Sequence, residues 1–248
     1  PPLFMHVAGE LPVPAEFRHR TTKNVFSGGA IRVVRHLLNQ ASQSATPAQG
    51  IRSIAKAAQV SFGAAHATVT KLESLGFLHR ESPRSGYRLQ NPVGLLNEWL
   101  ASGEAKFHHS LAFNAPSTRT EDLRLARDHL LSETGQAPLW TLASGLLPNE
   151  VFVSGMPHGA YLNGSPELLV RALNLRDVTP HNFLILVPRP EDQTEFGGIY
   201  DSPRDGLPHG KSICLPQLAA DFSALGGRGR EQSRFLVDEF AKKIQDAL

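Results

Sequence analysis

The chain has 248 residues, of which 41% are hydrophobic and 19% charged, and its formal net charge is +2. This composition is ordinary for a soluble globular protein and excludes a fibrous or disordered chain. A single cysteine, Cys214, excludes an internal disulfide framework, and no apolar run approaches the roughly 20 residues needed to span a bilayer. We therefore expect a cytoplasmic protein with no membrane partner.

The charge is divided unevenly along the chain. Residues 1–95 contain eleven Lys and Arg against four Asp and Glu and so carry +7, whereas the remaining residues carry −5. Such asymmetry is typical of a nucleic-acid-binding module joined to a different domain, because neutralised phosphates supply most of the sequence-independent affinity.

Two short helices are predicted after Gly28 and Gly29. In the first helix the apolar residues recur at helical spacing; they are Ile31, Val34, Leu37, Leu38 and Ala41. This spacing leaves Arg32, Arg35 and His36 on the outside. A breaker-rich loop separates this helix from the second, whose apolar positions are Ile51, Ile54, Ala55 and Ala58. We expect Val60 to fill the turn that follows.

A third helix is predicted to begin at Ser61, which is placed to cap it. Its inward stripe consists of Ala65, Val69, Leu72 and Gly76. The outward side chains are Ala64, His66, Ala67, Thr70 and Lys71. Small residues at the start of this helix, among them Gly63, would let its backbone approach base edges in a major groove.

A basic hairpin is predicted after the third helix. Gly76 suits the helix C-cap, and residues 79–89 are predicted to form a strand, a turn and a second strand. Arg80, Arg84 and Arg88 would place positive charge along this hairpin. Three helices followed by such a hairpin indicate a winged helix-turn-helix that binds duplex DNA, although some domains of this kind bind proteins instead. The candidate DNA-binding residues are Ser61, Gly63, Ala64, His66, Ala67, Thr70, Lys71, Arg80, Arg84, Ser85, Tyr87 and Arg88.

The second half of the chain mixes helices and strands. Helices are predicted over residues 123–133, 138–147 and 166–173 and around Phe235, Leu236, Phe240 and Ile244; strands are predicted over residues 151–153, 183–187 and 213–215. The fold class is therefore α+β, with an N-terminal winged helix-turn-helix and a mixed α/β C-terminal domain.

Four segments are expected along the chain. Pro1 to Val7 is β-like and is followed by proline-containing polar sequence, so we interpret residues 1–24 as the residual strand and linker of a missing upstream domain. The winged helix spans residues 25–92. Residues 93–119 form a linker with a short helix around Leu95, Leu96, Trp99 and Leu100, and residues 120–248 form the C-terminal domain.

No pattern in the second half predicts a catalytic, cofactor or metal site. Gly206 to Ser212 resembles a phosphate loop but has three residues between its glycines, and we expect no helix to begin at residues 213–216. His158 and His209 occupy identical Pro-His-Gly triplets, which we interpret as loop histidines, because metal-ligand spacing is missing. No Glu-x-Lys strand accompanies the scattered Asp201, Asp205 and Asp221.

Several sequence blocks resemble the AbiEi-type antitoxin and transcriptional regulator family of type IV toxin–antitoxin systems. These blocks are residues 58–63 with Leu72, Gly76 and Phe77, then 86–89, 95–99, 151–155, 160–162, 215–222 and 226–231. The resemblance implies a bacterial protein that binds promoter DNA, represses its own operon and neutralises a toxin through its C-terminal domain. Ala64, Ala65 and Ala67 depart from the polar or β-branched residues that the family often has, so sequence preference is expected from the wing or from DNA shape.

Three functions stay open at this stage. The first is a non-enzymatic, sequence-specific DNA-binding repressor without a cofactor, which would be associated with the nucleoid and would act as a monomer or a homodimer. The second is a nuclease or nucleotide-processing enzyme that docks on DNA through the winged helix, with chemistry in the C-terminal or missing domain; it would require a divalent metal. The third is a replication or partition factor that recognises repeated target sites.

Overall fold

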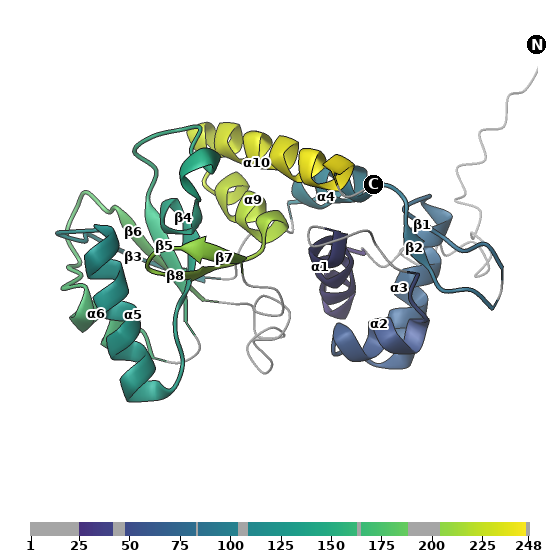
Figure 1. The fold of residues 1–248 in the computed structure, drawn as a ribbon, viewed down its shortest axis with the longest axis horizontal. Coiled ribbons are helices and arrows are strands. Elements are labelled where there is room, and N and C mark those ends of the chain that lie inside the picture. The colour runs from purple at the N-terminus through teal and green to yellow at the C-terminus, as the bar shows by residue number, and fades with distance from the viewer. Residues whose placement is uncertain are drawn as a thin grey trace, which may run out of the picture.

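The protein has a mixed α+β architecture, in agreement with the predicted class. The computed structural model describes residues 25–41, 48–82, 84–103, 109–162, 165–187 and 204–246. The predicted remnant of an upstream domain, residues 1–24, lies outside these ranges. Figure 1 shows a group of helices and a small ribbon at one end of the molecule and a larger sheet at the other. In the described ranges, no helix is both long and apolar enough to cross a membrane.

Residues 25–101 form what we call the helical unit. Its elements are α1 (Gly29–Ala41), α2 (Ile51–Ala57), α3 (Phe62–Ser74), β1 (Leu78–His79), β2 (Arg88–Leu89) and α4 (Pro92–Ala101). The two strands pair antiparallel, with Leu78 opposite Leu89. The three predicted helices and the predicted strand–turn–strand segment are therefore present in the order expected.

Both ends of α3 follow from local backbone chemistry. The hydroxyl of Ser61 accepts a hydrogen bond of 3.2 Å from the backbone N–H of Ala64, which confirms the predicted cap. At the other end Gly76 has φ +78°, a left-handed conformation that glycine adopts without strain. The predicted inward residues Ala65, Val69 and Leu72 are fully buried, whereas Gly76 is exposed beyond the helix.

The second sheet has six strands. They are β3 (His109–Phe113), β4 (Leu139–Leu142), β5 (His158–Tyr161), β6 (Phe183–Val187), β7 (Arg204–Leu207) and β8 (Gly210–Ser212), and their spatial order is β3-β6-β5-β4-β8-β7. The β5–β6 and β4–β8 pairs are parallel, and the other neighbouring pairs are antiparallel.

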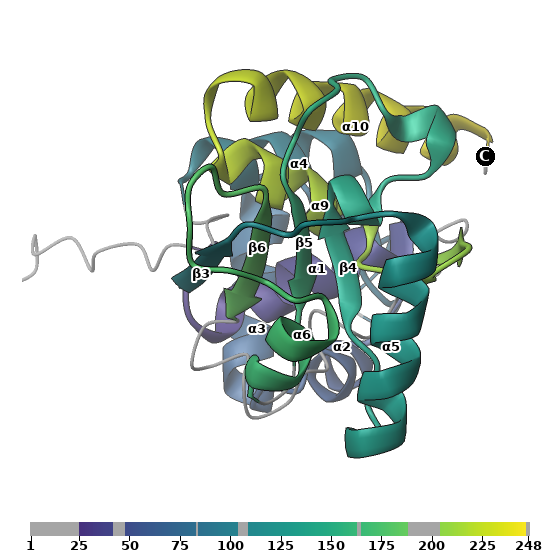
Figure 2. The same ribbon diagram turned by 90° about the vertical axis from the view of Figure 1, so that its left-hand side faces the viewer.

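Helices cover the two faces of this sheet. Helices α5 (Thr120–Thr134) and α6 (Glu167–Ala172) lie on one face, in front of the strands in Figure 2. Helix α9 (Leu215–Ala224) packs on the other face, and α10 (Gly227–Asp246) packs against α9. The predicted helices around residues 123–133 and 166–173, the C-terminal helix and the buried strand over 183–187 are all confirmed.

Several predicted elements are wrong or were missed. The segment expected as a helix over residues 138–147 contains strand β4 and a short 3-10 turn, Ala143–Gly145. Residues 151–153 form a loop, and a helix begins at Leu215 in place of the strand predicted over 213–215. Strand β3 was not predicted, because its residues were interpreted as part of a linker.

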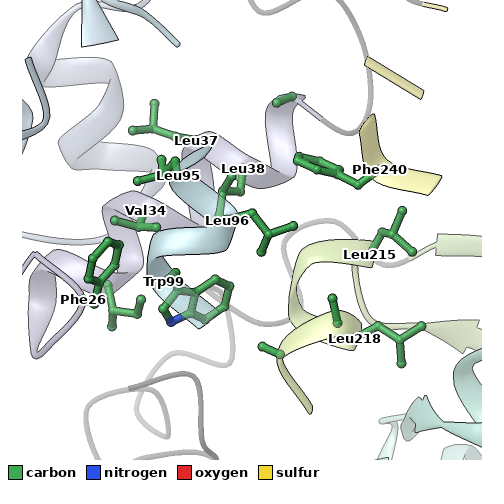
Figure 3. Packing of buried hydrophobic residues seen from close by; sticks show 14 of the residues in the cluster. Phe26, Val34, Leu37, Leu38, Leu95, Leu96, Trp99, Leu215, Leu218 and Phe240 are labelled. Carbon is green, nitrogen blue, oxygen red and sulfur yellow. The ribbon is translucent and has the colours of Figure 1, made fainter. Parts of the chain in front are cut away.

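One hydrophobic core joins the helical unit to the sheet. Leu37 and Leu38 of α1 and Leu96 of α4 belong to the same cluster as Leu218 of α9 and Phe240 of α10, as Figure 3 shows. Helix α1 contacts α3 and α4 as well as α9. It is therefore buried on two sides, and α4 is a packed element of the core rather than a free linker.

Candidate nucleic-acid interface

The outward face of α3 is open to solvent, as its sequence predicts. Gly63, His66, Ala67 and Thr70 are exposed, whereas Ala64 and Lys71 are half-buried. The carboxylate of Glu73 on this helix pairs with Arg80, and among the described residues the ammonium group of Lys71 has no carboxylate partner. A shallow row of glycine and alanine beside a lysine is what close approach to a nucleic-acid groove requires.

The first residue of α3 is an exposed aromatic that the sequence analysis did not single out. The side chain of Phe62 is 53% exposed, and its ring centroid lies 6.2 Å from that of His66. Its position directly after the cap residue, at the start of the predicted helix, is the sequence signal that could have identified it. Phe62 and His66 are therefore two exposed rings on the first turns of α3.

Some of the predicted DNA-binding residues of the ribbon are exposed to solvent, and others are buried or half-buried. Arg84 and Arg88 are exposed. Arg80 is half-buried: its Nε lies 3.2 Å from the Glu73 carboxylate, and its guanidinium lies 5.1 Å from the ring centroid of Tyr87. Tyr87 itself is only 5% exposed, so it is a core residue of the ribbon and not part of its open face.

Backbone hydrogen bonds fix the ribbon to the segment before α2. The N–H and C=O of Gln49 bond the C=O and N–H of Tyr87 at 2.9 and 2.8 Å. A Cβ on Gly86 would lie 2.6 Å from the backbone nitrogen of Gln49, so this close approach requires glycine. At the ribbon turn the hydroxyl of Ser85 donates to the carbonyl of Ser82 at 2.8 Å, which engages Ser85 within the turn. The ribbon is therefore held in a defined position relative to α3.

A groove runs between the start of α1 and α3. Its volume is about 540 Å³, and its walls are Val25, Ser27, Gly28, Gly29, Ala30, Ala64, Ala67, Thr68 and Lys71. Three of the predicted DNA-binding residues, Ala64, Ala67 and Lys71, therefore line one concave surface together with the residues at the start of α1. The remaining exposed candidates on the ribbon lie apart from it.

Arg35 does not belong to the outer face of α1, where the sequence analysis placed it. Its side chain is only 5% exposed, and its guanidinium carbon lies 5.8 Å from the centre of the Trp99 ring. Its charge also acts on the carboxyl of Asp221 across the core. The other two predicted outward residues are half-buried; Arg32 donates to the carbonyl of Gln59 at 3.1 Å, and His36 hydrogen-bonds the Gln49 amide at 3.0 Å.

The acidic residues considered for a metal site do not meet. Asp221 is fully buried and accepts hydrogen bonds from Thr141, Tyr161 and Gln217, and burial raises its pKa to about 6. Asp205 is exposed and lies 3.6 Å from Lys211, and Asp201 lies outside the described residues. Within the part of the chain that the structure describes, no three His, Cys, Asp or Glu residues are arranged to hold a metal ion.

The two Pro-His-Gly triplets converge on one serine. Nδ1 of His158 lies 3.0 Å from the hydroxyl oxygen of Ser144, and Nε2 of His209 lies 2.9 Å from the carbonyl oxygen of the same residue. The interpretation as loop histidines was therefore wrong for His158, which begins β5, and incomplete for His209, which is buried in the β7–β8 turn. Burial, with His209 nearby, lowers the pKa of His158 to about 4.

The hydroxyl of Ser144 is hydrogen-bonded to a histidine, as in a serine nucleophile, but it is not accessible to a substrate. The residue is 2% exposed, and the turn that carries it follows Leu142, whose φ of 53° is strained for a non-glycine residue. The next carbonyl, that of Gly145, accepts hydrogen bonds from Arg204 at 2.7 Å and from Ser212 at 2.8 Å. This dense set of bonds explains how the strained turn persists, and it leaves the hydroxyl closed to a substrate.

Residues 206–212 form a β-hairpin and not a phosphate-binding loop. Strand β7 ends at Leu207, strand β8 begins at Gly210, and His209 lies in the turn between them. Our expectation that no helix could begin nearby was wrong, because α9 starts at Leu215 with Pro216 in its first turn. The hairpin geometry, and not the absence of a helix, separates this segment from a nucleotide loop.

Comparison of the chain with protein-family models, with curated proteins and with solved structures gives no match.

Proposed function

We propose that the helical unit is a winged helix-turn-helix and that the protein binds duplex DNA through α3 and the ribbon. In this proposal α3 enters the major groove with its N-terminal turns first. Gly63, Ala64 and Ala67 permit close approach, and His66 and Phe62 supply the side chains that reach base edges. An imidazole can hydrogen-bond a base, and a phenyl ring can contact a thymine methyl group.

Phosphate contacts would come from the exposed cations around α3. Lys71 lies beside Ala64 and Ala67 on α3, and Arg84 and Arg88 are exposed on the ribbon. Residues 25–101 contain eight Lys and Arg against three Asp and Glu, a net charge of +5. Arg35 is buried and Arg80 is paired with Glu73, so we assign the proposed phosphate contacts to Lys71, Arg84 and Arg88.

The biological role that we propose is transcriptional repression of the protein's own operon, in the manner of an antitoxin. This role rests on the resemblance to AbiEi-type regulators and on the proposed DNA binding. It implies a bacterial cytoplasmic protein, promoter DNA as one partner, and a cognate toxin as the other. A homodimer would place two α3 helices on successive half-sites about one helical turn apart.

The observation that carries the proposal is the exposed, small-residue face of α3 with Lys71 beside it. The test is a fluorescence-anisotropy titration of random and candidate-promoter duplexes over a salt series, with and without Mg²⁺. Lys71→Ala should weaken binding to every duplex and flatten the salt dependence. The matched control is Arg171→Ala, which removes an exposed charge from α6 on the far side of the sheet.

The same titration separates base reading from docking. Phe62→Ala and His66→Ala should change the ratio of promoter to random affinity by about tenfold at most, while the salt slope is retained. No binding at low salt would exclude a DNA-binding role. Metal-dependent cleavage of the duplex, seen on a gel, would instead support the nuclease hypothesis.

A further inference from the structure

A polar crevice lies where the helical unit meets the helices that cover the sheet. It has a volume of about 480 Å³ and lies between the end of α4, the end of α9 and the first turns of α10. A volume of this size accommodates a small organic ligand. Its polar lining includes Asn97, Ser223, Arg230, Ser233 and Arg234, and Leu100 contributes an apolar wall.

Two solvent-exposed arginines give the crevice a positive charge. Arg230 and Arg234 are four residues apart on α10 and therefore lie on the same side of the helix. Among the described residues, neither side chain has an ion pair or a hydrogen bond. By contrast, Arg124 of α5 and Arg204 of β7 pair with carboxylates. No Asp or Glu lines the crevice.

Arg230 lies in the first turn of α10 and Arg234 one turn further along, so the unfavourable interaction with the helix dipole concerns Arg230. The positive end of a helix dipole lies at its N-terminus, and the first turn of α10 contains no acidic residue. Two like charges four residues apart on one helix also repel each other. A bound anion would offset both the effect of the helix dipole and the repulsion between the arginines, so an anionic ligand matches the charge of the crevice.

The neighbouring buried residues fix the helix backbone that carries the two arginines. The amide of Gln232 donates to the carbonyl of Glu150 at 2.7 Å and accepts from the backbone N–H groups of Phe152 and Val153, both at 2.9 Å. The hydroxyl of Ser233 donates to the carbonyl of Ala219 at 2.7 Å. The segment of α10 that carries Arg230 and Arg234 is therefore anchored to two parts of the protein before any ligand binds.

We propose that this crevice binds a small phosphomonoester. The two guanidinium groups would hold the phosphate, because their donors match its oxygens. Asn97 and Ser223 would hydrogen-bond the polar part of the ligand, and Leu100 would contact its organic part. The inference does not depend on DNA binding, because the crevice contains none of the residues proposed to contact DNA.

The test is isothermal titration calorimetry of the whole chain with AMP, adenosine and inorganic phosphate at constant ionic strength. We expect AMP and phosphate to bind and adenosine to give no heat. The double variant Arg230→Gln/Arg234→Gln should weaken AMP binding at least tenfold. The matched control, Arg228→Gln, removes a charge from the same helix, where Arg228 bonds the carbonyl of Ser154 outside the crevice.

Two further variants keep the result interpretable. Ala224→Trp fills the crevice without changing its charge and should also abolish AMP binding, and thermal unfolding of each variant checks that it is folded. Lys71→Ala should leave AMP binding unchanged, so failure of DNA binding and failure of the crevice proposal are distinguishable. Equal affinity for AMP and adenosine, wild-type AMP affinity in the double variant, or a double variant that loses only DNA affinity would each overturn the proposal.

Discussion

The hydroxyl of Tyr161 donates a hydrogen bond of 2.7 Å to Oδ1 of Asp221 and so links strand β5 to helix α9. Thr141 donates to Oδ2 of the same carboxylate at 2.6 Å, and Gln217 donates to Oδ1 at 2.8 Å. Every donor that surrounds this acid is buried. A buried acid with three donors fixes the position of α9 on the sheet, and it makes the stability of the protein dependent on pH.

Asp221→Asn should change that pH dependence. Because burial raises the folded-state pKa of Asp221 from 3.8 to about 6, the stabilisation by its neutral form is present below pH 3.8 and is lost as the pH rises through 6. Relative to the variant, the wild type should lose about 3 kcal/mol of unfolding free energy between pH 4 and pH 7. Urea denaturation at a series of pH values measures this difference, and a difference that does not vary with pH would contradict it.

His158→Asn tests a pH dependence of opposite sign. Burial of the His158 imidazole lowers its folded-state pKa from 6.5 to about 4. The stabilisation by its neutral form is therefore present above pH 6.5 and is lost as the pH falls toward 4. We expect the wild type to lose about 3 kcal/mol relative to the variant over this range. An NMR titration of the imidazole that places its pKa at or above 6.5 would refute the assignment.

Removal of the Arg204 side chain should strongly destabilise the fold around the six-stranded sheet. Arg204 pairs with the buried carboxylate of Glu150 and donates to the carbonyls of Gly145 and Ile213 at 2.7 and 3.0 Å. Arg204→Ala removes the closer of the two cations that, among the described residues, pair with the buried Glu150 carboxylate and leaves only Lys243 at 3.7 Å, so we expect a loss of about 3 kcal/mol. In the double variant with Glu150→Gln the loss should be smaller than the sum of the single losses. Additive losses in urea denaturation would show that the pair is not coupled.

The two ribbon arginines should differ in their effect on DNA binding. Arg84 is exposed at the ribbon turn, whereas Arg80 is paired with Glu73 and lies against Tyr87. Arg84→Ala should weaken binding to all duplexes and lower the slope of log K against log salt by about 1. Arg80→Ala should have a smaller effect on the slope. Equal slopes for Arg84→Ala and the wild type would remove the ribbon tip from the proposed interface.

The sequence predicted those elements that bury a single face or have a strong local signal. The third helix has a serine cap, a regular inward stripe and a terminal glycine, and all three features lie where they were expected. Strand β6 was predicted because Phe183 to Val187 is a continuous apolar run of strand length. The exposed face of α3 followed from the same periodicity.

Elements that are buried on more than one side gave no such pattern. Strand β4 is buried at all four positions, so Leu139 to Leu142 lacks the alternation of a half-buried strand. Helix α9 is buried at eight positions from Leu215 to Phe222, which removes the polar face that marks an amphipathic helix. Arg35 was misplaced for the same reason, since periodicity alone assumes that α1 has one buried side. The convergence of His158 and His209 on Ser144 depends on strand pairing between distant segments, which local sequence cannot predict.

The two-sided burial of α1 has a consequence for dissecting the protein. Cutting the chain after Ala101 would expose Leu38, Leu96 and Trp99 to water, and it would uncover Leu218 on the remaining piece. Each fragment would expose a contiguous hydrophobic patch and would tend to self-associate. Transfer of the first hundred residues to another protein would meet the same obstacle. The helical unit and the part of the chain with the six-stranded sheet must therefore be expressed and studied as one cooperative unit.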